Sequence, residues 1–235
     1  MRGNYGSVGT NPTSRLIAGQ DYGPVSTIPG ETLELDTPHG AARAHIRPVK
    51  HPRAALVLGH GAGGGVRAPD LLAASDAAAS ADFTVVLVEQ PYRVAGRRAP
   101  APARQLDIAW TAVLASLRAD QLQGLAVVAG GRSMGARVAC RTAAAVGAAA
   151  VLCLAFPLTP PRRATAKPAP SRLPELEAVA VPTLVIQGER DQFGLPPAGA
   201  GRTVIKVKGD HSLRSDLPGV GAAVSIWLAS LTTLG

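Results

Sequence analysis

Short, continuous runs of apolar residues recur along this 235-residue chain, and segments with helical periodicity separate most of them. Because a strand that is buried on both faces is apolar throughout, these runs predict the strands of a parallel sheet. The runs are Ala54 to Leu58, Phe83 to Val88, Leu125 to Ala129, Ala150 to Phe156, Thr183 to Gln187 and Thr203 to Val207.

Helices are predicted between these strands. From Leu106 to Leu117 apolar residues recur every three or four positions, which is typical of an amphipathic helix over Arg104 to Ala119. Alternating buried strands and helices predict an α/β fold, with a mostly parallel sheet covered by helices on both faces. The other predicted helices are Pro69 to about Ala79, Met134 to Val146, and a closing helix marked by Val220, Val224, Trp227, Leu228 and Leu231.

The two ends of this pattern differ from its middle. Residues 1–30 are rich in Gly, Ser, Thr, Asn and Pro, which predicts a flexible N-terminal arm before a domain over residues 31–235. Alternating polar and apolar positions at Glu31 to Asp36 and Ala42 to Arg47 predict an antiparallel hairpin. The proline-rich segment Pro157 to Pro174 predicts a surface loop or a minimal lid.

Composition narrows the class of protein. The net charge of +8 invites a nucleic-acid surface, but there are only four lysines and the arginines are scattered, so we expect no nucleic-acid partner. The longest apolar run, Ala143 to Phe156, is too short for a membrane span, and Met1 to Asn4 lead into no signal peptide. Cys140 and Cys153 lack metal-ligand spacing. We expect them to be buried, reduced thiols in a cytoplasmic protein that binds no metal or cofactor.

The segment Gly131-Arg132-Ser133-Met134-Gly135 lies between a predicted strand and a predicted helix. This is the setting of a nucleophile elbow, a sharp turn between glycines that exposes a serine hydroxyl above the sheet. Three other chemically unusual segments also follow predicted strands, namely His60 to Gly65, Glu89 to Tyr92 and Gly188 to Asp191. Ligand sites in such sheets lie beyond the carboxyl ends of the strands, so we expect the four segments to meet.

A serine nucleophile needs a histidine base and an acid that orients the base, in the chain order serine, acid, histidine. His211 is the sole histidine after Ser133 and is therefore the predicted base. Asp191 follows a strand at the position of the acid. Glu189 and Asp210 are alternatives, although Asp210 would have difficulty reaching the ring of its own neighbour.

The predicted oxyanion hole combines the backbone N–H of Met134, just after the nucleophile, with that of Ala62. Gly61 and Gly63 flank Ala62, and we expect them to let the backbone approach the substrate. We expect His60 to brace this loop. A phosphate-binding loop is excluded because no Gly-Lys-Ser/Thr follows, and the glycine spacing does not fit a dinucleotide fingerprint.

Two further residues have open roles. Tyr92 follows a strand and could contact the substrate, but a packed loop tyrosine is an equal alternative. Arg132 could bind an acidic substrate group, whereas a supporting role in the turn is favoured.

With these residues in place, the stretch from about Glu31 to Leu231 resembles an α/β hydrolase. Within that superfamily it is similar to the hydrolase-like domain of NSL chromatin complex subunit 3 and its testis-expressed relatives, a family with bacterial members. The matching segments are Gly59-His60-Gly61-Ala62-Gly63, Pro91-Tyr92 with Gly96-Arg97-Arg98, Gly131 to Gly135, Gly188-Glu189-Arg190-Asp191 and Gly209-Asp210-His211-Ser212.

The resemblance implies an eight-stranded sheet with Ser133, Asp191 and His211 as a catalytic triad, and it implies no particular substrate. Dienelactone-hydrolase-like enzymes are the nearest competing resemblance, but those commonly have cysteine where this chain has Ser133.

The sequence therefore predicts a serine hydrolase that cleaves a small or accessible ester or thioester through an acyl-enzyme. The short lid segment disfavours a long-chain lipase, and the chain has no room for the gating domain of a peptidase. The alternative is a hydrolase fold that serves as a scaffold for protein association, as the chromatin-complex relatives suggest.

Overall fold

The centre of the computed structural model is a nine-stranded sheet, and the structure describes residues 14–16, 30–160 and 170–232. The strands are β1 (Ser14–Leu16), β2 (Glu31–Leu35), β3 (Ala42–Arg47), β4 (Ala54–Gly59), β5 (Phe83–Glu89), β6 (Val127–Arg132), β7 (Ala150–Leu154), β8 (Thr183–Gly188) and β9 (Arg202–Val207). Their order across the sheet is β1-β2-β3-β5-β4-β6-β7-β8-β9. All pairs from β5 to β9 are parallel, whereas β1, β2 and β3 are antiparallel to their neighbours.

Burial along the strands follows their sequence pattern. The apolar strands β4 and β7 are buried at every position because helices cover both of their faces. In β3 buried and partly exposed residues alternate, as expected for a strand with one face toward solvent. The mostly parallel sheet predicted from the apolar runs is confirmed.

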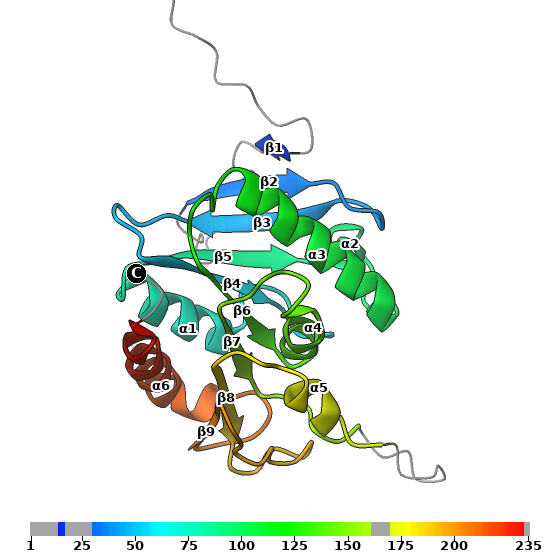
Figure 1. The fold of residues 1–235 in the computed structure, drawn as a ribbon. Helices are drawn as coiled ribbons and strands as arrows, with labels where there is room; N and C mark the ends of the chain where they lie inside the picture. Colours follow the sequence, from blue (N-terminus) through cyan, green and yellow to red (C-terminus); the bar gives the residue numbers. More distant parts are fainter. Residues whose placement is uncertain (1–13, 17–29, 161–169, 233–235) are drawn as a thin grey trace, which may run out of the picture.

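Helices cover both faces of the sheet, as predicted. They are α1 (Pro69–Ala79), α2 (Pro91–Val94), α3 (Ala103–Ala119), α4 (Met134–Thr142), α5 (Leu173–Glu177) and α6 (Leu217–Ser230). Figure 1 shows α1 and α6 on one face and α3 and α4 on the other. Two separate apolar cores result, one around Trp110 of α3 and one around Leu71 of α1 and Trp227 of α6. The sheet thus divides the core and leaves its carboxyl-end edge free for the loops.

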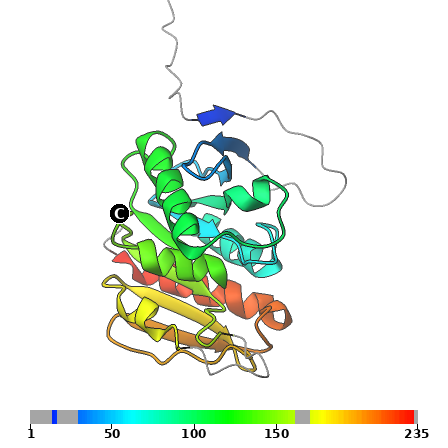
Figure 2. The same ribbon diagram turned by 90° about the vertical axis from the view of Figure 1, so that its right-hand side faces the viewer.

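Three differences from the sequence predictions concern short elements. The strand β1 lies within the arm expected over residues 1–30 and pairs with β2 at the edge of the sheet (Figures 1 and 2). Residues 1–13 and 17–29 of that arm lie outside the described part. The helix after Ser133 ends at Thr142 rather than Val146, and a turn follows that ends at Gly147 with a left-handed φ of 58°. α5 begins at Leu173, at the end of the proline-rich segment, and residues 161–169 of that segment are not described.

Cys140 and Cys153 face each other across α4 and β7. Both are buried and free, with their Sγ atoms 3.5 Å apart, so the prediction of reduced thiols is confirmed. In the described part of the chain, none of the helices has the length and apolar character needed to cross a membrane.

Candidate active site

Ser133 lies on the sharp turn between β6 and α4. Its φ of 52° is a left-handed conformation that non-glycine residues rarely adopt, and the turn is held by a hydrogen bond from the Ser133 N–H to the Leu154 carbonyl. Gly131 and Gly135 allow this turn to pack against β4, since a Cβ at either position would lie within 2.5 Å of the Gly59 carbonyl oxygen. The glycines on both sides of the predicted elbow are therefore required by close packing.

A hydrogen-bonded chain of three side chains begins at this serine. The Ser133 Oγ lies 2.9 Å from Nε2 of His211, and Nδ1 of His211 lies 2.8 Å from Oδ2 of Asp191. An ionised carboxylate only accepts hydrogen bonds, so Nδ1 carries the proton and Nε2 is left to accept from the serine hydroxyl. The structure thus brings together the three residues that the sequence predicted, and the spacings suit a proton on Nδ1 and an acceptor at Nε2.

Asp191 is fixed more firmly than the other two members of this chain. Its side chain is 1% exposed, and Oδ2 also accepts from Nε2 of Gln187 at 2.7 Å while Oδ1 accepts from the Phe193 N–H at 2.9 Å. The Phe193 ring packs edge-on against the His211 ring with centroids 4.4 Å apart. These contacts leave the imidazole one orientation, toward Ser133.

The alternative acids have other surroundings. Glu189 is exposed to solvent. Asp210 accepts from the N–H and the hydroxyl of Ser212, and these bonds lower the pKa of its carboxyl. Of the three carboxylates that the sequence left open, Asp191 is the one that contacts His211.

Arg132 supports the turn and the histidine loop together. Its Nε donates to Oδ2 of Asp70 at 2.8 Å, and its Nη2 donates to the backbone carbonyl of His211 at 3.1 Å. Burial raises the pKa of the Asp70 carboxyl, and the Arg132 charge opposes that rise. The supporting role favoured for Arg132 is therefore the one that its contacts display.

The loop after β4 is braced from beneath. The buried His60 donates from Nδ1 to the Gly61 carbonyl at 2.8 Å and accepts from the Gln90 N–H at Nε2, so both ring nitrogens are engaged by backbone. The Tyr92 hydroxyl donates to the Ala62 carbonyl at 2.9 Å. Burial raises the pKa of Tyr92 to about 12. His60 braces the loop as predicted, and Tyr92 holds the same loop.

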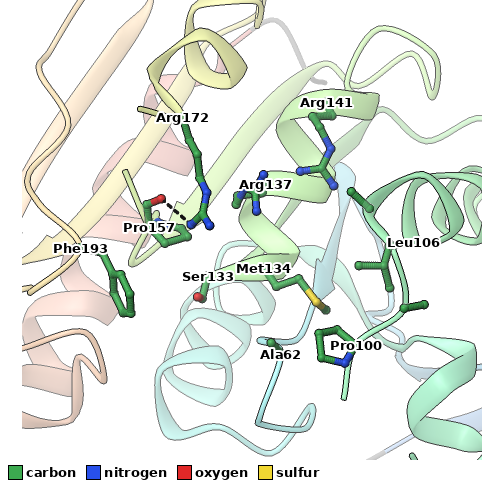
Figure 3. Close-up of a pocket in the computed structure, with 12 residues that line it drawn as sticks. Ala62, Pro100, Leu106, Ser133, Met134, Arg137, Arg141, Pro157, Arg172 and Phe193 are labelled. Carbon is green, nitrogen blue, oxygen red and sulfur yellow. Dashed lines mark hydrogen bonds between the residues drawn. The ribbon is translucent and has the colours of Figure 1, made fainter. Parts of the chain in front are cut away.

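A cavity of about 270 Å³ opens at Ser133. Ala62 and Met134, the residues of the two predicted oxyanion donors, line it, whereas Gly61, Gly63 and Tyr92, the candidates for substrate contact, do not. At Gly61 a Cβ would lie 2.8 Å from Nη1 of Arg132, whereas at Gly63 it would meet open space. The full lining is Ala62, Pro100, Ala101, Ala103, Leu106, Ser133, Met134, Arg137, Arg141, Pro157, Arg172 and Phe193 (Figure 3).

The arginines of this cavity, together with Asp70 and Gln187, are the parts of the site that the sequence did not predict. Asp70 resembles an ordinary acidic residue in the first turn of a helix, and Gln187 ends an apolar run. Their polar character in otherwise apolar segments was the signal available. Within the described part of the chain, no three His, Cys, Asp or Glu side chains gather as a metal site would require.

The sheet and its covering helices form the α/β-hydrolase fold, and comparison with protein-family models identifies the same class. Residues 52–215 match the family model described as the alpha/beta hydrolase domain, so the chain belongs to that family. The comparison with curated proteins found no match.

Solved structures with the same fold are distant in sequence. The chain is similar to an alpha-beta serine hydrolase homologue from Coxiella burnetii, with 15% identity, a TM-score of 0.67, and coverage of 87% of this chain and 100% of that one. It is similar to XC6422 from Xanthomonas campestris, an a/b serine hydrolase without lid, with 20% identity, a TM-score of 0.68, and coverage of 88% and 97%. Est1E from Butyrivibrio proteoclasticus has 13% identity, a TM-score of 0.69, and coverage of 86% and 99%.

Proposed function

We propose that this protein is a serine hydrolase that cleaves a small ester or thioester through an acyl-enzyme. The proposal rests above all on the chain of hydrogen bonds from Ser133 through His211 to Asp191, with spacings of 2.9 Å and 2.8 Å. Membership of the alpha/beta hydrolase family supports it.

In the proposed mechanism, Oγ of Ser133 attacks the acyl carbonyl carbon while Nε2 of His211 takes the hydroxyl proton. Asp191 stays ionised and stabilises the imidazolium through the proton on Nδ1. The carbonyl π electrons move to the oxygen, and the N–H groups of Met134 and Ala62 stabilise the resulting oxyanion. When the tetrahedral species collapses, the bond to the alcohol or thiol breaks and His211 returns the proton to that leaving group.

Hydrolysis of the acyl-enzyme repeats these steps with water. His211 removes a proton from water, the hydroxide oxygen attacks the same carbonyl carbon, and the bond to Ser133 Oγ breaks. The serine oxygen recovers its proton from His211, and the carboxylic acid leaves. Atoms balance with water as the second reactant, so no cofactor enters the proposed reaction.

The size of the cavity supports a small acyl group. About 270 Å³ beside Ser133 is near the lower end of ordinary ligand pockets, which suits a small group. We also propose that, within the superfamily, the protein is related to the small hydrolase-like domains of the NSL subunit 3 family. We further propose that it is a bacterial protein of the cytoplasm. The two free, buried cysteines are compatible with a reducing compartment.

The test uses a fluorophosphonate probe and p-nitrophenyl acetate. We expect the wild-type protein to be labelled at Ser133 and to hydrolyse the ester, and Ser133→Ala to lose both properties. Ser80→Ala is the matched control, because Ser80 is an exposed serine at the end of α1. Equal ester turnover by wild type and Ser133→Ala would overturn the proposed nucleophile.

A hydrolase fold that serves as a protein scaffold is the alternative outcome of this test. Folded wild-type protein that neither takes the probe nor hydrolyses any ester or thioester would favour the scaffold.

A further inference from the structure

Three arginines line the cavity that opens at Ser133. Arg137 and Arg141 extend from α4, and Arg172 precedes α5 on the other side of the opening. Figure 3 shows the Arg172 side chain reaching from the start of α5 into the space above Ser133, with Arg137 behind it. The two carboxylates that pair with these arginines, Asp107 and Glu175, do not line the cavity.

Two of the three guanidinium groups are already paired. Arg137 donates from Nε and Nη2 to the two oxygens of Glu175, which is a bidentate ion pair. Arg141 makes the same kind of pair with Asp107 and lies 3.4 Å from Glu175 as well. Asp107 and Glu175 together balance the charge of Arg137 and Arg141.

Arg172 is the third cation, and no carboxylate of the described residues lies within ion-pair distance of it. Its Nη1 donates to the Pro157 backbone carbonyl at 3.0 Å. Burial lowers the pKa of Arg172, and the charges of Arg137 and Arg141 lower it further against the opposing effect of Glu175. The neighbouring residues 161–169 contain no acidic residue in the sequence. The cavity wall therefore has one more positive charge than the carboxylates of the described residues neutralise.

From this geometry we propose that the cavity selects substrates that carry a carboxylate in addition to the ester, and that Arg172 binds this carboxylate. A guanidinium held in place by a backbone carbonyl keeps other N–H groups free, and its planar array of donors suits a carboxylate. The apolar part of the lining, including Leu106, Pro100 and Met134, would contact the carbon chain between the two groups. This inference rests on the proposed hydrolase function and narrows its substrate class to monoesters of dicarboxylic acids or esters of hydroxy acids.

The first experiment compares esters that differ only in the extra carboxylate. Monomethyl glutarate and methyl pentanoate place or omit it on the acyl side, whereas carboxymethyl butyrate and ethyl butyrate place or omit it on the alcohol side. We expect the wild type to prefer the acidic member of one pair by about ten- to a hundredfold in kcat/KM, the size expected for a charge-assisted hydrogen bond. The pair that shows the preference identifies the side on which the carboxylate is bound. Equal kcat/KM values within both pairs would overturn the proposal.

Variants connect the preference to one side chain. In Arg172→Gln the ratio of acidic to neutral kcat/KM should fall by about tenfold or more, mainly through KM, and Arg172→Lys should recover part of it. Arg104→Gln is the matched control. Arg104 is exposed on α3 next to the lining residue Ala103, so this substitution removes the same charge outside the cavity. A ratio that falls equally in Arg104→Gln and Arg172→Gln would contradict direct binding by Arg172.

A binding measurement separates this inference from the proposed chemistry. In calorimetric titrations at low salt, Ser133→Ala should bind monomethyl glutarate or carboxymethyl butyrate, and the double variant Ser133→Ala/Arg172→Gln should bind at least about tenfold more weakly. Thermal melting verifies that both proteins are folded. If Ser133→Ala binds neither acidic ester, the anion subsite is wrong even where the wild type hydrolyses neutral esters. If Ser133→Ala binds an acidic ester but the wild type hydrolyses no ester or thioester, the anion subsite is supported and the hydrolase proposal fails.

Discussion

Two histidines at the same edge of the sheet have opposite surroundings. His60 follows β4 and is fully buried, with both ring nitrogens bonded to backbone groups. His211 follows β9, and its side chain is 18% exposed, with its ring nitrogens bonded to side chains of Asp191 and Ser133. Burial lowers the pKa of His60, which keeps its imidazole neutral.

The different surroundings indicate different roles: His60 braces a loop, and His211 is the proposed base. Nε2 of His211 faces the Ser133 hydroxyl, which is the arrangement that proton transfer in the proposed mechanism needs. At His60 a proton transfer would break a buried hydrogen bond to the backbone. The number of hydrogen bonds is the same, so the partners and the exposure of each ring distinguish the two roles.

The largest expected effect is on activity, and it comes from replacing His211, the less buried of the two histidines. His211→Ala should lower kcat for p-nitrophenyl acetate by about 10⁵-fold, because Ser133 loses the base that accepts its proton. The free energy of unfolding should change by less than about 1 kcal/mol, since the side chain is partly exposed to solvent. Steady-state kinetics and urea unfolding measure the two quantities. Retention of more than a hundredth of wild-type activity would contradict the role of His211.

His60→Ala should show the reverse balance. We expect the free energy of unfolding to fall by about 2–3 kcal/mol, because the Gln90 N–H and the Gly61 carbonyl lose their buried partner. Activity should fall by only about tenfold, through displacement of the Ala62 loop. The same two measurements apply. A variant with wild-type stability, or one as inactive as His211→Ala, would refute the distinction between the two histidines.

The smallest effect is the dependence of stability on pH. The unfolded chain takes up a proton on this histidine below its ordinary pKa of 6.5, whereas the folded protein resists protonation at His60. The free energy of unfolding of the wild type should therefore decrease as the pH falls from 6.5 toward the lowered pKa, by at most about 1.4 kcal/mol per pH unit. His60→Ala lacks this contribution, so urea unfolding from pH 7 to 5 should give it a shallower slope. Parallel slopes would contradict the burial of a neutral imidazole.

Much of the fold could be predicted because a parallel sheet has a simple sequence pattern. Buried strands such as β4 and β7 are apolar at every position, and α1 begins and ends at the predicted residues. The elements that were not predicted, β1, α2 and α5, are at most five residues long and lie in segments rich in Gly or Pro. Such elements are stabilised by tertiary contacts rather than by a periodic pattern, so local sequence contains little information on them.

The site divides in the same way. Ser133, Asp191 and His211 could be predicted because each follows a strand and their chain order is constrained. The cavity arginines could not be predicted, because Arg137 and Arg172 come from separate segments and only the folded structure brings them to one cavity. Packing also decides which arginines form ion pairs. Glu175 forms ion pairs with Arg137 and Arg141, whereas Arg172 lies beyond ion-pair distance of it.

Arg132 connects the first turn of α1 to Ser133 and to the loop of His211. The Asp70 side chain is bonded through this guanidinium to the His211 carbonyl, and Arg132 is the residue directly before Ser133. Ser133 and His211 come from loops about eighty positions apart, yet the Arg132 guanidinium connects both loops. A substitution of Asp70 should consequently disturb the placement of Ser133 and His211, although α1 contributes no residue to the cavity wall.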